Sequence, residues 1–242
     1  EISIGDWSSD VCSSDLVCIT GILMRLFLLI LQLKILHAGY VSKFPLVSRL
    51  KFASQKEIPL SMRRINEIFY SLQGEGYHTG IPAVFVRFSG CNLRCPFCDT
   101  QHEEGTLMSD EDIAMEVAKY STQVVILTGG EPGLWIDEKL VDALHHEGKY
   151  VCIETNGTCL LPENIDWVTC SPKEGAKINL DRIDEVKVVY VGQDVSAYLD
   201  LSASHYFLQP CSCANTEEVI AYILQHPEWR LSLQTHKLLQ IP

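Results

Sequence analysis

The chain has 242 residues, with 19 Lys and Arg against 31 Asp and Glu, which gives a formal net charge of -12. Proteins that follow a phosphate backbone usually carry clustered excess Lys and Arg, whereas the only clustering of basic residues here is in scattered pairs such as Arg63 and Arg64. This balance argues against a nucleic-acid-binding surface and favours a small molecule or another protein as the partner. With 47% apolar and 21% charged residues, the composition is that of an ordinary globular domain.

The sequence pattern of residues 1–61 differs from that of the rest of the chain. The run GDWSSDVCSSDL repeats the word SSD and looks like translated adapter sequence, and an apolar stretch follows over 16–36. That stretch is long enough for a membrane span or a signal segment, but Arg25 lies near its middle and no small-residue cleavage site is evident. We therefore expect 1–61 to be a non-native or disordered extension, Met62 to open the native domain, and the protein to be cytoplasmic without membrane contact.

From Met62 onward, short apolar runs alternate with amphipathic ones, which is typical of a parallel α/β sheet. Ser109 is suited to cap a helix, because three acidic residues fill the turn that follows it. In chain order, the expected elements are a strand at 81–88, a helix at about 110–120, a strand at 124–127, a helix at 136–147, strands at 150–153, 167–170, 186–191 and 205–208, a helix at 216–225 and a strand at 231–233.

Polar or glycine-rich residues directly follow six of these expected strands. They are Gly90-Cys91, Thr128 to Glu131, Glu154 to Gly157, Ser171 to Lys173, Gln209-Pro210 and Gln234 to Lys237. The carboxyl ends of parallel strands meet at one edge of a sheet, and that edge carries the active site in α/β barrels. The sequence therefore predicts one convergent site at this edge.

Three of the ten cysteines form a tight C-x3-C-x2-C motif: Cys91, Cys95 and Cys98. Three thiolates at this spacing can hold a [4Fe–4S] cube, which leaves one iron without a protein ligand and open to a substrate or cofactor. The alternative is a zinc site completed by His102 or a distant cysteine, although the chain has no second C-x2-C knuckle. The other seven cysteines are expected to be free thiols in a reducing compartment.

The cysteine loop, with the aromatic residue Phe97 before its last cysteine, and the turn Gly129-Gly130-Glu131-Pro132 together resemble the signature of radical S-adenosylmethionine (SAM) enzymes. The resemblance implies that the open iron binds the amino and carboxylate groups of SAM and that the Gly-Gly-Glu-Pro turn contacts the methionyl amine. The reduced cluster would then cleave SAM to a 5′-deoxyadenosyl radical, which abstracts a hydrogen atom from the substrate.

Further short segments within 62–242 resemble the 7-carboxy-7-deazaguanine synthase family. Among them are Ser71 to Gly76, Gly80 to Ala83, Cys98-Asp99-Thr100 and Trp229 to Lys237. This resemblance implies an α/β fold, an incomplete TIM-type barrel of six parallel strands, and a homodimer. It also implies a Mg²⁺ requirement and an electron donor such as flavodoxin or ferredoxin. The implied reaction contracts 6-carboxy-5,6,7,8-tetrahydropterin to 7-carboxy-7-deazaguanine with loss of ammonia, on the route to queuosine.

The resemblance also implies roles for individual residues. Those expected to contact the pterin are Leu72, Gln73, Gly74, Arg87, Thr128, Glu154, His236 and Pro242, the last through a chain-terminal carboxylate. Those expected to bind SAM are Gly130, Ser171, Pro172, Lys173, Gln209 and Pro210. Cys91, Cys95 and Cys98 would hold the cluster, and Thr100 would give Mg²⁺ an oxygen ligand. No side chain is expected to act as a catalytic group, because the radical forms on the cofactor.

Plainer alternatives stay open for several of these residues. Arg87 could form a surface salt bridge, Thr100 and Glu154 could cap turns or loops, and His236 could be a structural histidine. Two other functions also stay open. One is a glycyl-radical activase that acts on a protein partner, and the other is an electron carrier whose cluster has a fourth protein ligand.

Overall fold

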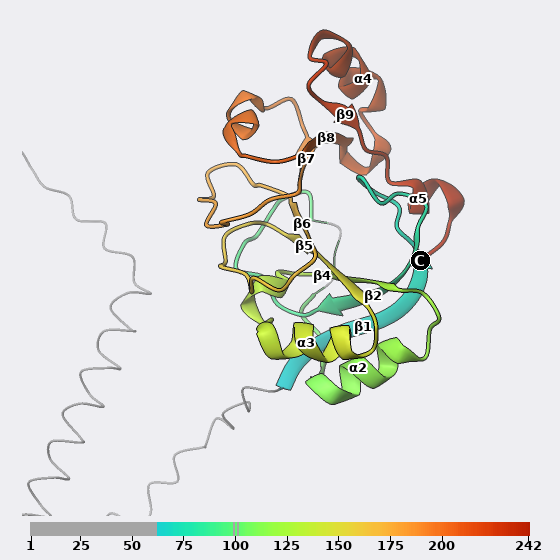
Figure 1. Cartoon of the computed structure of the whole chain (residues 1–242). Coiled ribbons are helices and arrows are strands. Elements are labelled where there is room, and N and C mark those ends of the chain that lie inside the picture. The colour runs from blue at the N-terminus through green and yellow to red at the C-terminus, as the bar shows by residue number, and fades with distance from the viewer. Residues whose placement is uncertain (1–61, 99, 101) are drawn as a thin grey trace, which may run out of the picture. The chain divides into compact units, whose positions relative to one another are not determined.

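The computed structural model describes residues 62–98, 100 and 102–242 (Figure 1). The expected extension over 1–61, with the apolar stretch weighed as a membrane span, lies outside the described residues and stays a prediction. None of the helices in the described part of the chain has the length and apolarity needed to cross a bilayer.

A nine-stranded sheet organises the described residues, with the strand order β3-β1-β2-β4-β5-β6-β7-β8-β9. The strands are β1 (Met62–Leu72), β2 (Pro82–Phe88), β3 (Thr106–Ser109), β4 (Val124–Gly129), β5 (Tyr150–Thr155), β6 (Trp167–Cys170), β7 (Glu185–Tyr190), β8 (His205–Pro210) and β9 (Arg230–Leu231). Every pairing from β2 to β9 is parallel, and β1 pairs antiparallel with both β2 and β3. Because β3 and β9 end the strand order, the sheet forms an open partial barrel, as the family resemblance implies.

Four α-helices accompany this sheet in the described residues: α2 (Asp110–Ala118), α3 (Glu138–His146), α4 (Thr216–Gln225) and α5 (Thr235–Leu239). Figure 1 shows α2 and α3 side by side next to β1 and β2, and α4 beside β8 and β9. The buried apolar faces of α2 and α3 join one core cluster with β1, β2, β4 and β5, and α4 packs through Val219 into a second cluster with β7 and β8. These helices leave the carboxyl edge of the parallel strands uncovered for the site.

The starts of α2 and α3 follow from local hydrogen bonding. Ser109 and Asp112 form a capping box, in which the Ser109 hydroxyl accepts from the Asp112 backbone N–H at 3.1 Å. Asp137 caps α3 by accepting from Leu140 N–H at 3.1 Å. The buried guanidinium of Arg63 on β1 donates to Asp110 and to Asp137 at 2.7 Å each, so it ties both helix starts to the sheet.

The expected elements are confirmed, with differences mostly at their ends. Strand 167–170 and helix 216–225 have the predicted bounds, and the helix predicted at 136–147 is α3 at 138–146. Strands β1 and β3 and the short helix α5 were not expected. The resemblance implied six parallel strands, and this number is wrong: β2 and β4 through β9 are seven, because the two-residue β9 extends the sheet past β8.

Candidate active site

A cavity of about 710 Å³ opens at the carboxyl edge of the parallel strands. Most of the residues predicted for the site line it. They come from the end of β1 and the loop after it, from the strands β2, β4, β5 and β8, from the loops after β2, β4 and β6, and from the C-terminal segment. These lining residues are Leu72, Gln73, Gly74, Arg87, Cys91, Cys95, Cys98, Thr100, Thr128, Gly130, Glu154, Ser171, Lys173, Gln209, Pro210, His236 and Pro242. Of the predicted residues only Pro172 is outside this lining set; it is buried between Ser171 and Lys173.

The loop after β2 carries the three cysteines into this cavity. The Cys91 sulfur accepts from the backbone N–H of Leu93 at 3.4 Å, and Asn156 Nδ2 approaches the same sulfur at 4.0 Å. Burial raises the pKa of the Cys91 thiol, and the charges of Glu131, Cys95 and Cys98 add to this effect. Proteins stabilise the thiolates of iron–sulfur clusters through hydrogen bonds that N–H groups donate to the cysteine sulfurs.

The chemistry of this donor set fits an iron–sulfur cube. Across the described residues, no three Cys, His, Asp or Glu side chains converge tightly enough to hold one metal ion. A cube binds each thiolate to a different iron, so its ligands stand further apart than the ligands of a single ion. Cys91 and Cys95 are partly buried and Cys98 is exposed, all three line the cavity from one loop, and an amide donor approaches the Cys91 sulfur, so this loop offers a cube three thiolates and leaves one iron open to the cavity.

The Gly-Gly-Glu-Pro turn after β4 is fastened to the base of the cysteine loop. Gly130 N–H donates to the Phe88 carbonyl at 3.0 Å, and Glu131 N–H donates to the Gly90 carbonyl at 2.9 Å. A Cβ on Gly130 would collide with the Gly90 carbonyl, and Gly129 adopts a φ of 120°. Both glycines are therefore required for this close approach of two backbones.

The Glu131 side chain is fully buried and is outside the lining of the cavity. Its carboxylate accepts from Thr155 Oγ1 at 2.7 Å, from Asn156 N–H at 2.7 Å and from Gly133 N–H at 2.8 Å. Burial raises the pKa of Glu131 although these donors oppose the rise. The glutamate thus joins the end of β4 to the end of β5, while the glycines of the same turn face the cavity.

Glu154, at the end of β5, is the centre of a hydrogen-bond network on the cavity floor. Its Oε1 accepts from Gln73 Nε2 at 3.0 Å and from Lys187 Nζ at 3.1 Å, and its Oε2 accepts from Thr128 Oγ1 at 3.1 Å. Burial alone would raise the pKa of Glu154, but Lys187 and the donated hydrogen bonds outweigh burial and hold it below its usual value. Two predicted substrate contacts, Gln73 and Thr128, are therefore hydrogen-bonded to a third, Glu154.

The network includes Lys187, Glu75 and Gln234, which the sequence reasoning missed. Lys187 Nζ donates to Glu75 Oε2 at 2.6 Å, and Gln234 Nε2 donates to Glu75 Oε1 at 3.0 Å. A signal for Lys187 was available, because a lysine inside the buried strand EVKVVY needs a partner. The partner could not be named from the sequence, since Glu75 is 112 positions away.

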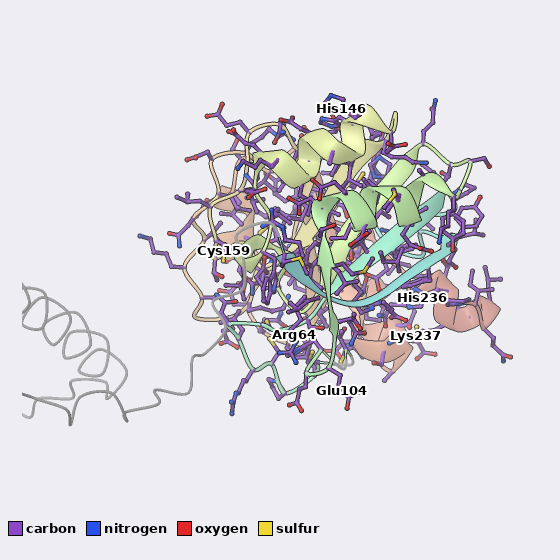
Figure 2. All side chains as sticks on the ribbon, turned by 90° about the horizontal axis from the view of Figure 1, so that it is seen from below. Arg64, Glu104, His146, Cys159, His236 and Lys237 are labelled. Carbon is purple, nitrogen blue, oxygen red and sulfur yellow. The ribbon has the colours of Figure 1, made fainter. Side chains whose placement is uncertain are left out.

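The other predicted pterin contacts gather around the loop after β1. Arg87 Nε donates to Glu67 Oε1 at 2.7 Å, and its guanidinium lies over the Phe69 ring at 5.6 Å. The salt bridge weighed as the plainer alternative for Arg87 is thus present, in a side chain that also lines the cavity. His236 abuts Gly74, and Figure 2 shows His236 next to Lys237 on α5.

The side chains predicted to bind SAM lie at the ends of β6 and β8. Lys173 Nζ donates to the Ser171 carbonyl at 2.6 Å, and Gln209 Oε1 accepts from Ser232 Oγ at 3.0 Å. Burial lowers the pKa of Lys173, although the charges of Cys95 and Cys170 oppose the decrease. A half-buried cation beside the cysteine loop suits a site that holds thiolates and a carboxylate.

Comparison with known proteins agrees with this geometry. Residues 85–205 match the Radical SAM superfamily. The chain is 70% identical over 180 residues to the 7-carboxy-7-deazaguanine synthase of Bacteroides thetaiotaomicron. The aligned region covers 74% of this chain and 99% of that relative. The chain is 41% identical over 206 residues to the enzyme of the same name from Bradyrhizobium diazoefficiens, and this alignment covers 73% and 98% of the two chains.

A solved structure supports the same assignment. The crystal structure of QueE from Escherichia coli superimposes with a TM-score of 0.62 at 31% sequence identity, covering 71% of this chain and 93% of that one. Identity of this level over nearly the full length of the relatives establishes common membership. The chain belongs to the 7-carboxy-7-deazaguanine synthase family of the radical SAM superfamily.

Proposed function

We propose that this chain converts 6-carboxy-5,6,7,8-tetrahydropterin to 7-carboxy-7-deazaguanine with loss of ammonia, in the biosynthesis of queuosine. The observation that carries the proposal is that the cysteine loop and the Gln73–Glu154–Thr128 network line the same cavity. The 70% identity to a relative named for this product supports it.

The radical SAM family uses a [4Fe–4S] cluster and SAM, and in this chain Cys91, Cys95 and Cys98 would hold the cluster. When bound, the cluster and SAM supply a carbon-centred radical that takes a hydrogen atom from the substrate. The cavity walls would position the reacting carbon and exclude water and thiols, which is the main contribution that a protein makes to such chemistry. Gly130, Ser171, Pro172, Lys173, Gln209 and Pro210 would surround SAM.

Polar groups at the opposite side of the cavity are suited to a pterin carrying a carboxylate. A pterin presents N–H donors at its pyrimidine edge, and the Glu154 carboxylate at the cavity floor can accept them. Arg87 would donate from its terminal nitrogens to the substrate carboxylate, because a planar guanidinium matches a planar carboxylate. Leu72, Gln73, Gly74, Thr128, His236 and Pro242 complete the proposed pterin site.

Three further properties belong to the proposal. Mg²⁺ would bind the substrate carboxylate together with the Thr100 oxygen, since it is a hard cation that prefers oxygen ligands. The enzyme would act as a homodimer in the cytoplasm and would take its electron from a flavodoxin or a ferredoxin. Magnesium dependence of turnover and the mass of the purified protein in solution test the first two properties.

The function is tested by anaerobic reconstitution of the cluster, followed by turnover with the tetrahydropterin, SAM and dithionite. Mass spectrometry is expected to detect 7-carboxy-7-deazaguanine and released ammonia, both dependent on SAM. An intact cluster that cleaves SAM but yields no deazapurine would overturn the proposal.

Gly74→Ala is expected to raise KM for the pterin by about tenfold, with a smaller change in kcat. A Cβ at Gly74 would collide with the His236 ring and its backbone N–H, so the two elements would have to separate. Steady-state kinetics measures this effect. The control is Gly148→Ala, which strains a φ of 70° far from the cavity and is expected to cost about 1 kcal/mol of stability without changing KM.

A further inference from the structure

We propose that Lys187 is a positioning residue for substrate recognition, because its buried ammonium keeps the Glu154 carboxylate ionised and turned toward the cavity. There the carboxylate accepts hydrogen bonds from the pyrimidine edge of the pterin. The inference rests on the proposed function, since it takes the substrate to be a pterin.

The geometry places Lys187 between two carboxylates. Lys187 lies inside β7 and is 4% exposed, with Nζ 2.6 Å from Glu75 Oε2 and 3.1 Å from Glu154 Oε1. An ammonium at this depth is costly unless it is paired, and it is bonded to both acids. Glu75 is held from its other oxygen by Gln234, so Lys187 is anchored on one side and holds Glu154 on the other.

The hydrogen bonds around Glu154 leave one acceptor position for a ligand. An ionised carboxylate offers about four lone pairs. Oε1 uses two of them on Gln73 and Lys187, and Oε2 uses one on Thr128. The remaining lone pair is therefore on Oε2, in a side chain that is 22% exposed and lines the cavity. A donor on the substrate can reach it only while the group is a carboxylate, because a protonated oxygen would donate instead.

Lys187 is the cation that contacts Glu154 directly. The other titratable groups near these two residues are Glu75 in the loop after β1, Glu185 on β7, Cys152 on β5 and Lys173 in the loop after β6. Of these, the carboxylates Glu75 and Glu185 disfavour ionisation of Glu154, and burial disfavours it as well. The Cys152 thiol is neutral, because burial raises its pKa far above its usual value. Burial opposes both shifts, and after burial the contact between the two groups is the largest cause of the lowered pKa of Glu154 and of the raised pKa of Lys187. Gln73 and Thr128 add to the first shift, and Glu75 and Glu185 add to the second.

The test is the pH dependence of KM for the pterin in Lys187→Met, measured from about pH 6 to about pH 9. Without the cation, burial dominates, so the Glu154 pKa is expected to rise into this range. KM should then be at least tenfold above wild type near pH 6 and approach it as the pH rises. In the wild type KM should be flat, because the lowered pKa keeps Glu154 ionised throughout. A purely structural lysine would raise KM equally at every pH, and that result would overturn the proposal.

Two further variants keep the test decisive. Lys187→Gln retains a donor but no charge and is expected to show the same pH dependence, including where Lys187→Met fails to fold. Glu75→Gln breaks the other ion pair and leaves the cation on Glu154, so its KM is expected to stay independent of pH. A pH-independent KM in Lys187→Gln, or a wild-type KM that itself rises below pH 7, would contradict the proposal.

Two readouts separate this inference from the proposed function. Binding of the fluorescent oxidised analogue 6-carboxypterin, titrated at each pH, should weaken in Lys187→Met as KM rises. The iron and sulfide bound after anaerobic reconstitution should match wild type, because the cysteine loop is unchanged. If the wild type cleaves SAM but makes no deazapurine, the proposed function fails. If the wild type turns over and Lys187→Met binds the analogue as tightly at every pH, only the role of Lys187 fails.

Discussion

Cys95→Ala is expected to reduce formation of 7-carboxy-7-deazaguanine to background. Three thiolates are the smallest set that can retain the cube in this loop, and the described residues around it offer no fourth cysteine among the cavity walls apart from Cys211. Loss of one thiolate should therefore lower the iron and sulfide bound after anaerobic reconstitution. It should also abolish cleavage of SAM, because the cleavage requires an electron from the cluster.

The control for this variant is Cys159→Ala. Cys159 is a free, partly buried cysteine that is outside the cavity lining, so iron content and turnover should equal those of the wild type. Retention of full turnover by Cys95→Ala would contradict the assignment of this loop to the cluster. An equal loss of iron content and turnover in both variants would indicate general damage to the fold instead.

Glu131→Ala is expected to lower the free energy of unfolding by about 3 kcal/mol. The substitution leaves three buried donors, on Gly133, Thr155 and Asn156, without their acceptor. It also frees the turn that holds Gly130 against Gly90, so retention of the cluster should fall with stability. Urea denaturation of the cluster-free protein under anaerobic conditions measures the stability effect separately.

Thr155→Val is the matched control for the glutamate. It removes one of the three donors to Glu131 together with the acceptor of the Gly157 N–H, and it keeps the side-chain shape, so it should cost about 1–2 kcal/mol. If Glu131→Ala costs no more than Thr155→Val, the carboxylate does not hold β4 to β5 as described. A large loss of stability combined with unchanged cluster content would contradict the link between the turn and the cysteine loop.

The parallel half of the fold could be predicted because its strands are short, apolar and buried. Strand β1 could not, since its buried positions include the charged Arg63 and a register shift between Ile65 and Glu67 interrupts the alternation. Strand β3 is four residues long and pairs only with β1, so nothing local distinguishes it from a loop. Both strands are specified by tertiary pairing.

Much of the cavity lining could be predicted, because the carboxyl ends of the parallel strands, and the polar residues that follow them, meet at one edge of the sheet. The network within it could not, because the contacts join residues far apart in the sequence. Lys187 and Glu75 illustrate this. Lys187 stands in no motif, Glu75 lies in the recognised segment Ser71 to Gly76 without an expected role, and only the fold brings Nζ within 2.6 Å of Oε2. Glu131 shows the opposite case: it stands in the recognised turn, yet its side chain bonds to β5 and the cavity is lined by the glycines beside it.

One iron of the cluster is expected to have no protein ligand and to bind SAM directly. Electron–nuclear double resonance of the dithionite-reduced protein, with SAM carrying ¹⁵N in its amino group, measures this most directly. We expect a resolved coupling between the cluster spin and that nitrogen, together with a change in the electron paramagnetic resonance spectrum on addition of SAM. A spectrum that SAM leaves unchanged, with no nitrogen coupling, would show an iron already saturated by side chains and would contradict the account.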